Sequence, residues 1–297
     1  MQKDNQLVAI FRSLRPHQWS KNLLLVVPAI AAQIWMQPDV IQVLVFACIA
    51  FSLTASGGYI VNDLIDLDAD RRHPEKQFRP FASGQIPVSW GLVMGTALLL
   101  SGIAVAYGAV NTQFGAIVVI YALLSAAYSR WIKRLLLLDV LLLAGFYAVR
   151  LVAGGAAVNV EVSSWLLAFS MFFFLSLAFA KRLMEFDFSS TEDSSSNSVR
   201  PYTSVDRDAF RTIGPTCGLL SILVLALYIS SDTVQAIYGQ PQVLWLVCPL
   251  LLYWVLRVWF IALRGDLHHD PVVFALRDKG SYAVATAILI VLFLASR

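Results

Sequence analysis

Acidic and amide side chains gather directly after an apolar run, in the stretch NDLIDLDAD from Asn62 to Asp70. If the preceding helix continues, Asp63, Asp66 and Asp70 share one of its faces, and Asn62 lies four residues before the second of them. Three carboxylates on one face repel one another unless a cation lies among them. Oxygen ligands favour Mg²⁺, which uses one or two carboxylates and takes further ligands from substrate phosphates. The spacing therefore predicts a Mg²⁺ site that receives a phosphorylated substrate.

Charged residues around this run extend the prediction. Asp68 falls on the opposite helical face, so we expect it to point away from the metal. Lys76 and Arg79 follow in the next loop, and their charges suit the same phosphates. The alternative interpretation is a solvated loop in which acids and bases pair with one another. The one-face spacing and the position at the edge of an apolar segment favour the metal site.

The composition indicates where this site lies. The chain has 297 residues, of which 58% are hydrophobic and 14% charged, whereas a soluble domain carries about a quarter charged residues. Apolar runs close to the ~20 residues that cross a bilayer recur along the whole chain. We therefore expect a multi-pass helical membrane protein and no nucleic-acid partner. Nine spans are expected at about 22–36, 40–61, 87–107, 112–129, 136–157, 163–182, 212–231, 241–262 and 279–296.

The connections between these spans alternate in charge. Lys and Arg gather at the N-terminus and in every second connection, whereas the connections near Asp39, Ala109, Glu161 and Asp232 contain neither. The positive-inside rule then predicts a cytoplasmic N-terminus, an external C-terminus and polar loops on the cytoplasmic side. The longest of these loops, about 185–207, is rich in Ser and is either a solvated linker or a lid.

Four basic residues in or beside the spans have more than one interpretation each. Arg150 lies well inside the fifth expected span, where it contacts a phosphate, forms a structural ion pair or extends toward one end. Lys21 is a donor-phosphate contact or an interfacial anchor beside the first span. Lys133 and Arg134 are phosphate ligands or ordinary cytoplasmic cations.

The stretch NDLIDLDAD resembles the NDxxDxxxD motif of the UbiA superfamily of intramembrane prenyltransferases. The resemblance covers essentially the whole chain in span count and motif order. It implies an all-α membrane protein of nine transmembrane helices around a central cavity, with cytoplasmic polar loops, formed as a single domain from residue 1 to 297. It also implies that Asn62, Asp63, Asp66 and Asp70 hold a Mg²⁺ ion bound to a diphosphate.

Other segments resemble one branch of that superfamily, the decaprenyl-phosphate phosphoribosyltransferases. Where ordinary members carry a second Asp-rich motif, this chain reads AFAKRLMEF, with Lys181 and Arg182 in place of acids. Cations there suit a lipid monophosphate bound directly. The branch is also suggested by RPHQWSKN, HPEKQFRPFASG and the segment YSRWIKRLLLLDVLLLAGFYAVRLVAGG that begins at Tyr128, and this resemblance adds Tyr128 to the expected substrate contacts.

The function implied by this branch is transfer of 5-phosphoribose from phosphoribosyl pyrophosphate (PRPP) to a polyprenyl phosphate, with release of pyrophosphate. Such an enzyme would be a pentosyltransferase in a bacterial inner membrane and would supply cell-wall or surface polysaccharide precursors. A homo-oligomer is compatible with the sequence. The first alternative is a prenyltransferase that moves a polyprenyl chain to a small acceptor. The second, a cation or lipid transporter, is disfavoured because the expected spans lack the acids at mid-membrane depth that mark a transport path.

Overall fold

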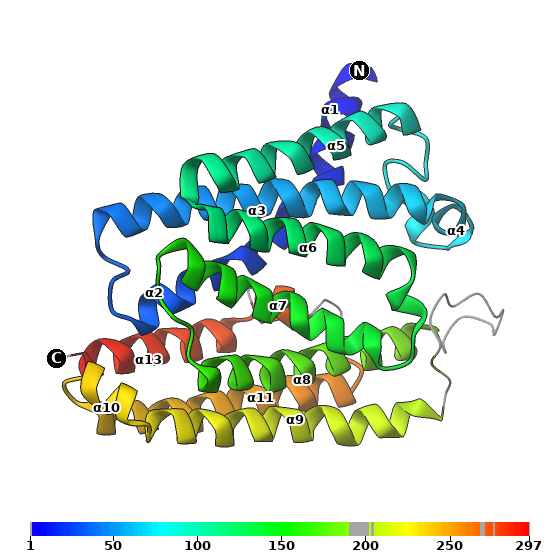
Figure 1. Ribbon diagram of the computed structural model, residues 1–297. Coiled ribbons are helices and arrows are strands. Elements are labelled where there is room, and N and C mark those ends of the chain that lie inside the picture. Colours follow the sequence, from blue (N-terminus) through cyan, green and yellow to red (C-terminus); the bar gives the residue numbers. More distant parts are fainter. Residues whose placement is uncertain (1, 190–201, 203–204, 268–270, 276, 297) are drawn as a thin grey trace. The chain divides into compact units, whose positions relative to one another are not determined.

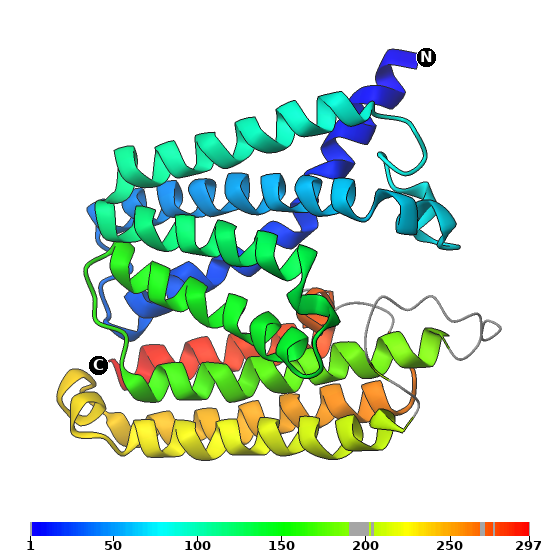
Figure 2. The same cartoon turned by 45° about the vertical axis from the view of Figure 1, so that its right-hand side comes forward.

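A computed structural model describes residues 2–189, 202, 205–267, 271–275 and 277–296 (Figures 1 and 2). Every regular element in these residues is a helix, so the expected all-α class is confirmed. Most of the Ser-rich loop lies outside the described residues, and its interpretation as a lid stays a prediction.

Seven described segments are long and apolar enough to cross a membrane. They are Pro38–Ile65 (α3), Val88–Val110 (α5 and η3), Thr112–Arg130 (α6), Leu138–Ala157 (α7), Ser164–Glu185 (in α8), Asp206–Ile229 (α9) and Pro241–Leu263 (η5 and α11). The last expected span is a shorter apolar helix, Lys279–Ala295 (α13). The first is divided between the 3-10 helix η1 (Pro16–Val26) and the short α2 (Val27–Ala31). Nine spans and a central cavity therefore stay predictions.

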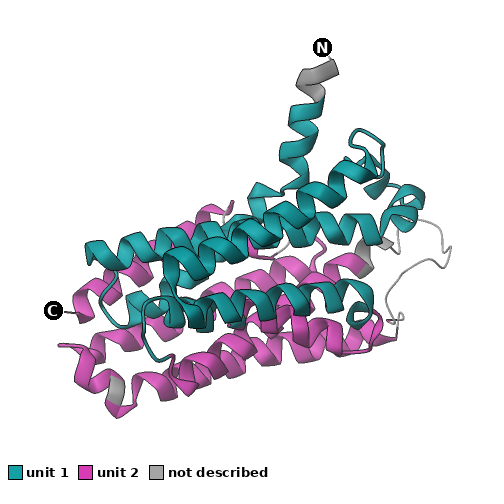
Figure 3. Cartoon of the chain, turned by 45° about the horizontal axis from the view of Figure 1, so that its top comes forward, with its two compact units in different colours: residues 1–133, 149–161 teal, residues 134–148, 162–297 magenta. Residues whose placement is uncertain are grey.

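The described helices fall into two compact units, drawn in different colours in Figure 3. Unit 1 comprises residues 1–133 and 149–161, and unit 2 comprises residues 134–148 and 162–297. The long helix α7 contributes its first half to unit 2 and its second half to unit 1. Each unit is described by itself.

Unit 1 is built around α3, which packs along α5 and α6. Small residues allow the close approach: a Cβ on Gly57 would lie 2.8 Å from the carbonyl oxygen of Gly95, and one on Gly102 would lie 2.8 Å from that of Ala50. Such residues are typical of helix contacts in membranes, where van der Waals packing replaces the hydrophobic effect. Helix α5 itself spans Val88–Val105. The unit also contains α1 (Gln2–Ser13), α4 (Leu67–Arg72), the 3-10 helix η2 (Lys76–Phe78), the π-helix η3 (Ala106–Val110) and most of the 3-10 helix η4 (Ile132–Arg134).

Unit 2 is built around α8 (Ser164–Ser189) and α9, which pack along each other, with α11 (Val247–Leu263) against both. The indole N–H of Trp259 in α11 donates a hydrogen bond of 2.8 Å to the hydroxyl of Ser176 in α8, and both groups are buried. The remaining elements are α10 (Asp232–Ile237), η5 (Pro241–Leu246), α12 (Pro271–Ala275) and α13.

Candidate functional site

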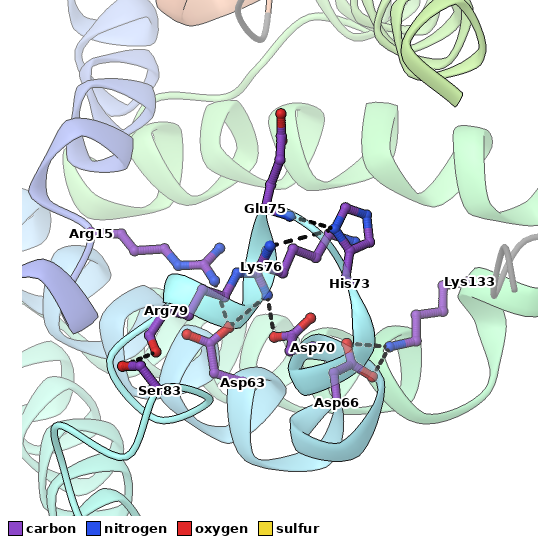
Figure 4. A network of polar contacts seen from close by, with 10 residues as sticks. All are labelled: Arg15, Asp63, Asp66, Asp70, His73, Glu75, Lys76, Arg79, Ser83 and Lys133. Carbon is purple, nitrogen blue, oxygen red and sulfur yellow. Dashed lines mark hydrogen bonds and ion pairs between the residues drawn. The ribbon is translucent and has the colours of Figure 1, made fainter. Parts of the chain in front are cut away.

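The acidic run lies at the C-terminal end of α3 and in α4 (Figure 4). Helix α3 ends at Ile65, so the uninterrupted helix that the spacing assumed is not formed. The backbone N–H of Asp66 nevertheless donates to the carbonyl of Asn62 at 2.9 Å, and that of Asp70 donates to Asp66 at 2.8 Å. These bonds keep nearly helical spacing across the break.

Two of the aspartates are buried and share one cation. Asp63 is 2% exposed and Asp70 is 4% exposed. One nitrogen of Arg79, Nη1, donates to Oδ1 of Asp63 at 3.1 Å and to Oδ2 of Asp70 at 2.6 Å. The guanidinium therefore lies between the two carboxylates.

Asp66 has a different partner. The ammonium Nζ of Lys133 lies 2.5 and 2.6 Å from the two oxygens of Asp66. Lys133 is carried by η4, directly after α6, and is 8% exposed. By contrast, the Asp68 side chain is 89% exposed and lies 3.9 Å from Arg71, which agrees with the expectation that it points away.

Arg15 also belongs to this cluster, although the sequence did not single it out as a site residue. Its Nη2 donates to Oδ1 of Asp63 at 2.5 Å, and its guanidinium lies 5.2 Å from the ring centre of Tyr59. The backbone of Arg15 is left-handed, with φ 52° and ψ 58°, a region that few residues other than glycine adopt. The one available sequence signal was its place at the head of the segment RPHQWSKN.

The loop after α4 places Arg79. The side chain of His73 accepts hydrogen bonds at Nδ1 from the backbone N–H of Glu75 (3.2 Å) and of Lys76 (3.4 Å). Burial, followed by the charge of Lys76, lowers the pKa of His73, which favours the neutral ring that this acceptor role requires. The hydroxyl of Ser83 donates to the carbonyl of Arg79 at 2.8 Å and holds the far end of the loop. Lys76 itself is exposed.

The donor set of this cluster fits a hard divalent cation. No group of three His, Cys, Asp or Glu side chains with metal-binding geometry occurs in the part of the chain that the structure describes. Mg²⁺ needs only one or two carboxylates when water and phosphate oxygens complete its shell. Asp63 and Asp70 supply such oxygens, and Asn62 lies half-buried beside them.

Arg150 forms a second buried polar group in unit 1. It is 3% exposed, its Nε donates to the amide oxygen of Asn22 at 3.0 Å, and its Nη2 donates to the hydroxyl of Tyr121 at 3.0 Å. It also lies 5.6 Å from the ring centre of Phe51. These contacts hold the Arg150 side chain inside the unit, so it does not simply extend toward a helix end. Two further predicted residues, Lys21 in η1 and Tyr128 in α6, are half-buried in the same unit.

The three remaining predicted residues belong to unit 2. Arg134 is exposed, and Lys181 is half-buried in α8. Arg182 is 1% exposed, and it donates to Asp139 at 2.8 Å and to Glu185 at 2.7 Å. Asp139 therefore orients the guanidinium of Arg182.

Tyr202 completes this buried group. Its hydroxyl donates to Asp139 and accepts a hydrogen bond of 3.2 Å from the backbone N–H of Leu137. Burial, then the bond to Asp139 and its charge, raise the pKa of Tyr202, so the hydroxyl stays a donor at neutral pH.

These features define a class of protein: a helical chain with several apolar spans and a cation-lined acidic cluster at the end of one of them. The model of the UbiA prenyltransferase family matches residues 24–277, and the chain belongs to this family of transferases. Membership of this family and the seven apolar helices among the described residues identify the chain as a multi-pass integral membrane protein.

Several relatives align along most of the chain. The nodulation protein NoeC of Azorhizobium caulinodans is 33% identical over 90% of this chain and 86% of that protein. A decaprenyl-phosphate phosphoribosyltransferase of Mycobacterium tuberculosis is 31% identical over 95% of this chain and 92% of the enzyme. The uncharacterized protein y4nM of Sinorhizobium fredii is 36% identical over 93% of this chain, which spans only 53% of that relative.

Solved structures agree on the fold. A UbiA homolog from Archaeoglobus fulgidus bound to GPP and Mg²⁺ matches with a TM-score of 0.72 and 17% identity, over 96% of this chain and 99% of that one. A UbiA homolog from Aeropyrum pernix K1 matches with a TM-score of 0.61 and 17% identity, over 94% of this chain and 96% of that one. At this identity the likeness supports the fold alone.

Proposed function

We propose that this chain transfers 5-phosphoribose from PRPP to a polyprenyl phosphate and releases pyrophosphate. The observation that carries the proposal is the similarity to the Mycobacterium tuberculosis phosphoribosyltransferase along 95% of the chain. A decaprenyl-phosphate phosphoribosyltransferase of Corynebacterium glutamicum, 34% identical over 59% of this chain, supports the same assignment.

The acidic cluster is the proposed donor site. Asn62, Asp63, Asp66 and Asp70 would hold Mg²⁺, which supplies charge neutralisation on the departing diphosphate. Arg15 before η1, Lys76 and Arg79 in the loop after α4, and Lys133 in η4 supply cations from three segments of unit 1. Their guanidinium and ammonium groups bind the phosphates and orient the ribose carbon for attack.

The acceptor side of the reaction needs no general base, because a lipid phosphate is already anionic at neutral pH. Catalysis then consists of positioning and electrostatic stabilisation of the separating charges. We also assign substrate contacts to Lys21, Tyr128 and Arg150 in unit 1 and to Arg134 in unit 2. The buried Arg150 already bonds to the neutral groups of Asn22 and Tyr121, which hold its guanidinium in a fixed orientation.

Lys181 and Arg182 are the proposed contacts of the lipid phosphate. Because Arg182 is already paired with Asp139 and Glu185, a phosphate at this position would share its guanidinium with both carboxylates. Arg182 then acts mainly by fixing the end of α8, while its neighbour Lys181 meets the phosphate.

A transferase with this acceptor would reside in a bacterial inner membrane, with the charged loops in the cytoplasm. Glu161 is an exposed residue in a connection without cations. In a Glu161→Cys variant, labelling of the new cysteine by an impermeant reagent added from outside tests this orientation.

Prenyl transfer is the second candidate, favoured by the family description and by the fold shared with homologs solved with GPP. Purified protein incubated with Mg²⁺ and polyprenyl phosphates of several lengths separates the two functions. With PRPP as donor, the proposal predicts a phosphoribosylated lipid, identified by mass spectrometry. Prenyl transfer from a prenyl diphosphate to a small acceptor, without any PRPP-dependent lipid product, would replace it.

A further inference from the structure

We infer that Arg79 serves as an internal cation of the acidic cluster, and that a divalent metal binds Asp63 and Asp70 only by displacing it. The inference rests on the proposed function in one respect, namely that these two carboxylates receive the metal. It adds a competition within the site, which couples metal binding to diphosphate binding.

Burial makes a positive partner necessary for the two carboxylates. Asp63 and Asp70 are 2% and 4% exposed, and ionised carboxylates that far from water require a compensating charge. Arg79 provides it to both at once, with a single nitrogen 3.1 and 2.6 Å from their oxygens. A metal that bridged the same oxygens would occupy the position of that nitrogen.

Charge repulsion opposes a metal at this position. Oδ1 of Asp63 also accepts a bond of 2.5 Å from Arg15, so two guanidinium groups meet at one carboxylate oxygen. A divalent ion approaching this oxygen is repelled by both at contact distance, where the local dielectric screens poorly. The metal alone should therefore bind weakly, and removal of Arg79 should help it.

Arg79 follows η2 in an extended conformation, with φ −62° and ψ 145°, and its side chain is 28% exposed. It can leave the carboxylates without moving a helix. A diphosphate that arrives with the metal offers the guanidinium new anionic oxygens, in the geometry that arginine binds best. Metal and diphosphate then strengthen each other's binding, by the same factor in both directions.

The experiment measures Mn²⁺ binding to the purified full chain by electron paramagnetic resonance, with and without inorganic pyrophosphate. It compares wild type with Arg79→Gln and with Arg71→Gln, which removes the same charge from an exposed position beside Asp68. Without pyrophosphate, Arg79→Gln should bind Mn²⁺ about tenfold more tightly than wild type, because a repelling charge is gone from the site. Pyrophosphate should tighten Mn²⁺ binding strongly in wild type and much less in Arg79→Gln.

Two results would overturn the inference. One is Mn²⁺ affinity in Arg79→Gln that equals or falls below that of wild type without pyrophosphate. The other is an equal gain in Mn²⁺ affinity in Arg71→Gln, which would show that only the net charge of the protein matters. Neither PRPP nor lipid enters this measurement, so its outcome is independent of whether the chain transfers phosphoribose. Circular dichroism and gel filtration of both variants verify that the fold is retained.

Discussion

Asp63 and Asp68 belong to the same acidic run but have opposite surroundings. The side chain of Asp63 is 3% exposed and is held by two arginines, whereas that of Asp68 is 89% exposed. We expect Asp63→Ala to lower the rate of transfer by about 10²-fold or more, as loss of one preorganised electrostatic contact does elsewhere. Asp66→Ala should cause a similar loss.

The matched control is Asp68→Ala, which should keep most of the activity. The measurement is kcat and KM for PRPP at saturating Mg²⁺ for all three variants. Equal losses at the three positions would show that burial and ion pairing do not distinguish catalytic from solvated acids in this run.

Lys181 and Arg182 are adjacent cations that we expect to behave differently. Removing one partner of a buried ion pair typically costs about 3–5 kcal/mol in the free energy of unfolding. Arg182→Ala should therefore lower the thermal unfolding temperature markedly, because Asp139, which is fully buried, keeps its charge. Lys181→Ala should leave stability almost unchanged and raise KM for the lipid phosphate.

Thermal unfolding in detergent and lipid-dependent kinetics of the two variants provide the test. The double variant Arg182→Met with Asp139→Leu should recover part of the lost stability, since neither charge is then left alone in the interior. If Arg182→Ala unfolds at the same temperature as wild type, Arg182 does not have the structural role. If both single variants have the lipid kinetics of wild type, the proposed lipid-phosphate site is wrong.

At the scale of elements, the start of α13 depends on one carboxylate. Asp278 accepts bonds from Arg257 in α11 at 2.5 and 2.9 Å, and from the backbone N–H of Ser281 at 2.6 Å. The bond from Arg257 is the largest influence that lowers the pKa of Asp278 to about 2. A depressed carboxyl pKa stabilises the folded state above the unfolded value of about 4, and the contribution disappears as pH falls toward 2.

Two substitutions separate the cap from the ion pair. Asp278→Asn keeps an N-cap acceptor and loses the charge, whereas Asp278→Ala loses both and should cost about 1 kcal/mol more. The stability difference between wild type and Asp278→Asn should be largest near neutral pH and should shrink as pH falls from about 5 to about 2. Thermal unfolding across this pH range measures it, and a constant difference would contradict the assigned cause.

Helical elements were largely predictable because hydropathy depends on local sequence, but their ends were not. The break at Asp66 depends on how α4 turns into the following loop, and no residue in the stretch is a strong helix breaker. The first expected span contains Pro28 and folds as a 3-10 helix followed by a short α-helix, although its composition suits a single span. Propensity therefore predicts the type of most elements and leaves their continuity to tertiary packing.

For the site, the acidic side was predictable and the pairing was not. The spacing predicted that Asp63 and Asp70 share one face, and in the structure both accept from Arg79, whereas the Mg²⁺ expected among them stays a prediction. The contact of Arg15 with Asp63 joins residues 48 positions apart, and that of Lys133 with Asp66 joins residues 67 apart. Such long-range pairs follow from the fold, and no local pattern in a single sequence encodes them.

At the scale of the whole molecule, the proposed transfer assigns a separate role to the polar cluster of each unit. Unit 1 supplies buried carboxylates among cations, which suit a metal-bound diphosphate. Unit 2 supplies Lys181, whose charge suits a phosphate without a metal, next to the buried Arg182 that bonds to Asp139. An enzyme that joins PRPP to a lipid monophosphate uses both kinds of site, whereas an acceptor without a phosphate leaves the second one unused.

The most direct test of this account follows the two halves of PRPP separately. Purified protein receives Mg²⁺, a polyprenyl phosphate and PRPP with one label in the ribose and another in the diphosphate, and the lipid and aqueous phases are then separated. We expect the ribose label to enter the lipid while an equal amount of diphosphate label remains in water as pyrophosphate, and we expect Asp63→Ala to slow both changes by about 10²-fold or more. Transfer of the diphosphate label to the lipid would contradict this reaction. So would a protein that forms no labelled lipid from PRPP but transfers a prenyl chain from a prenyl diphosphate.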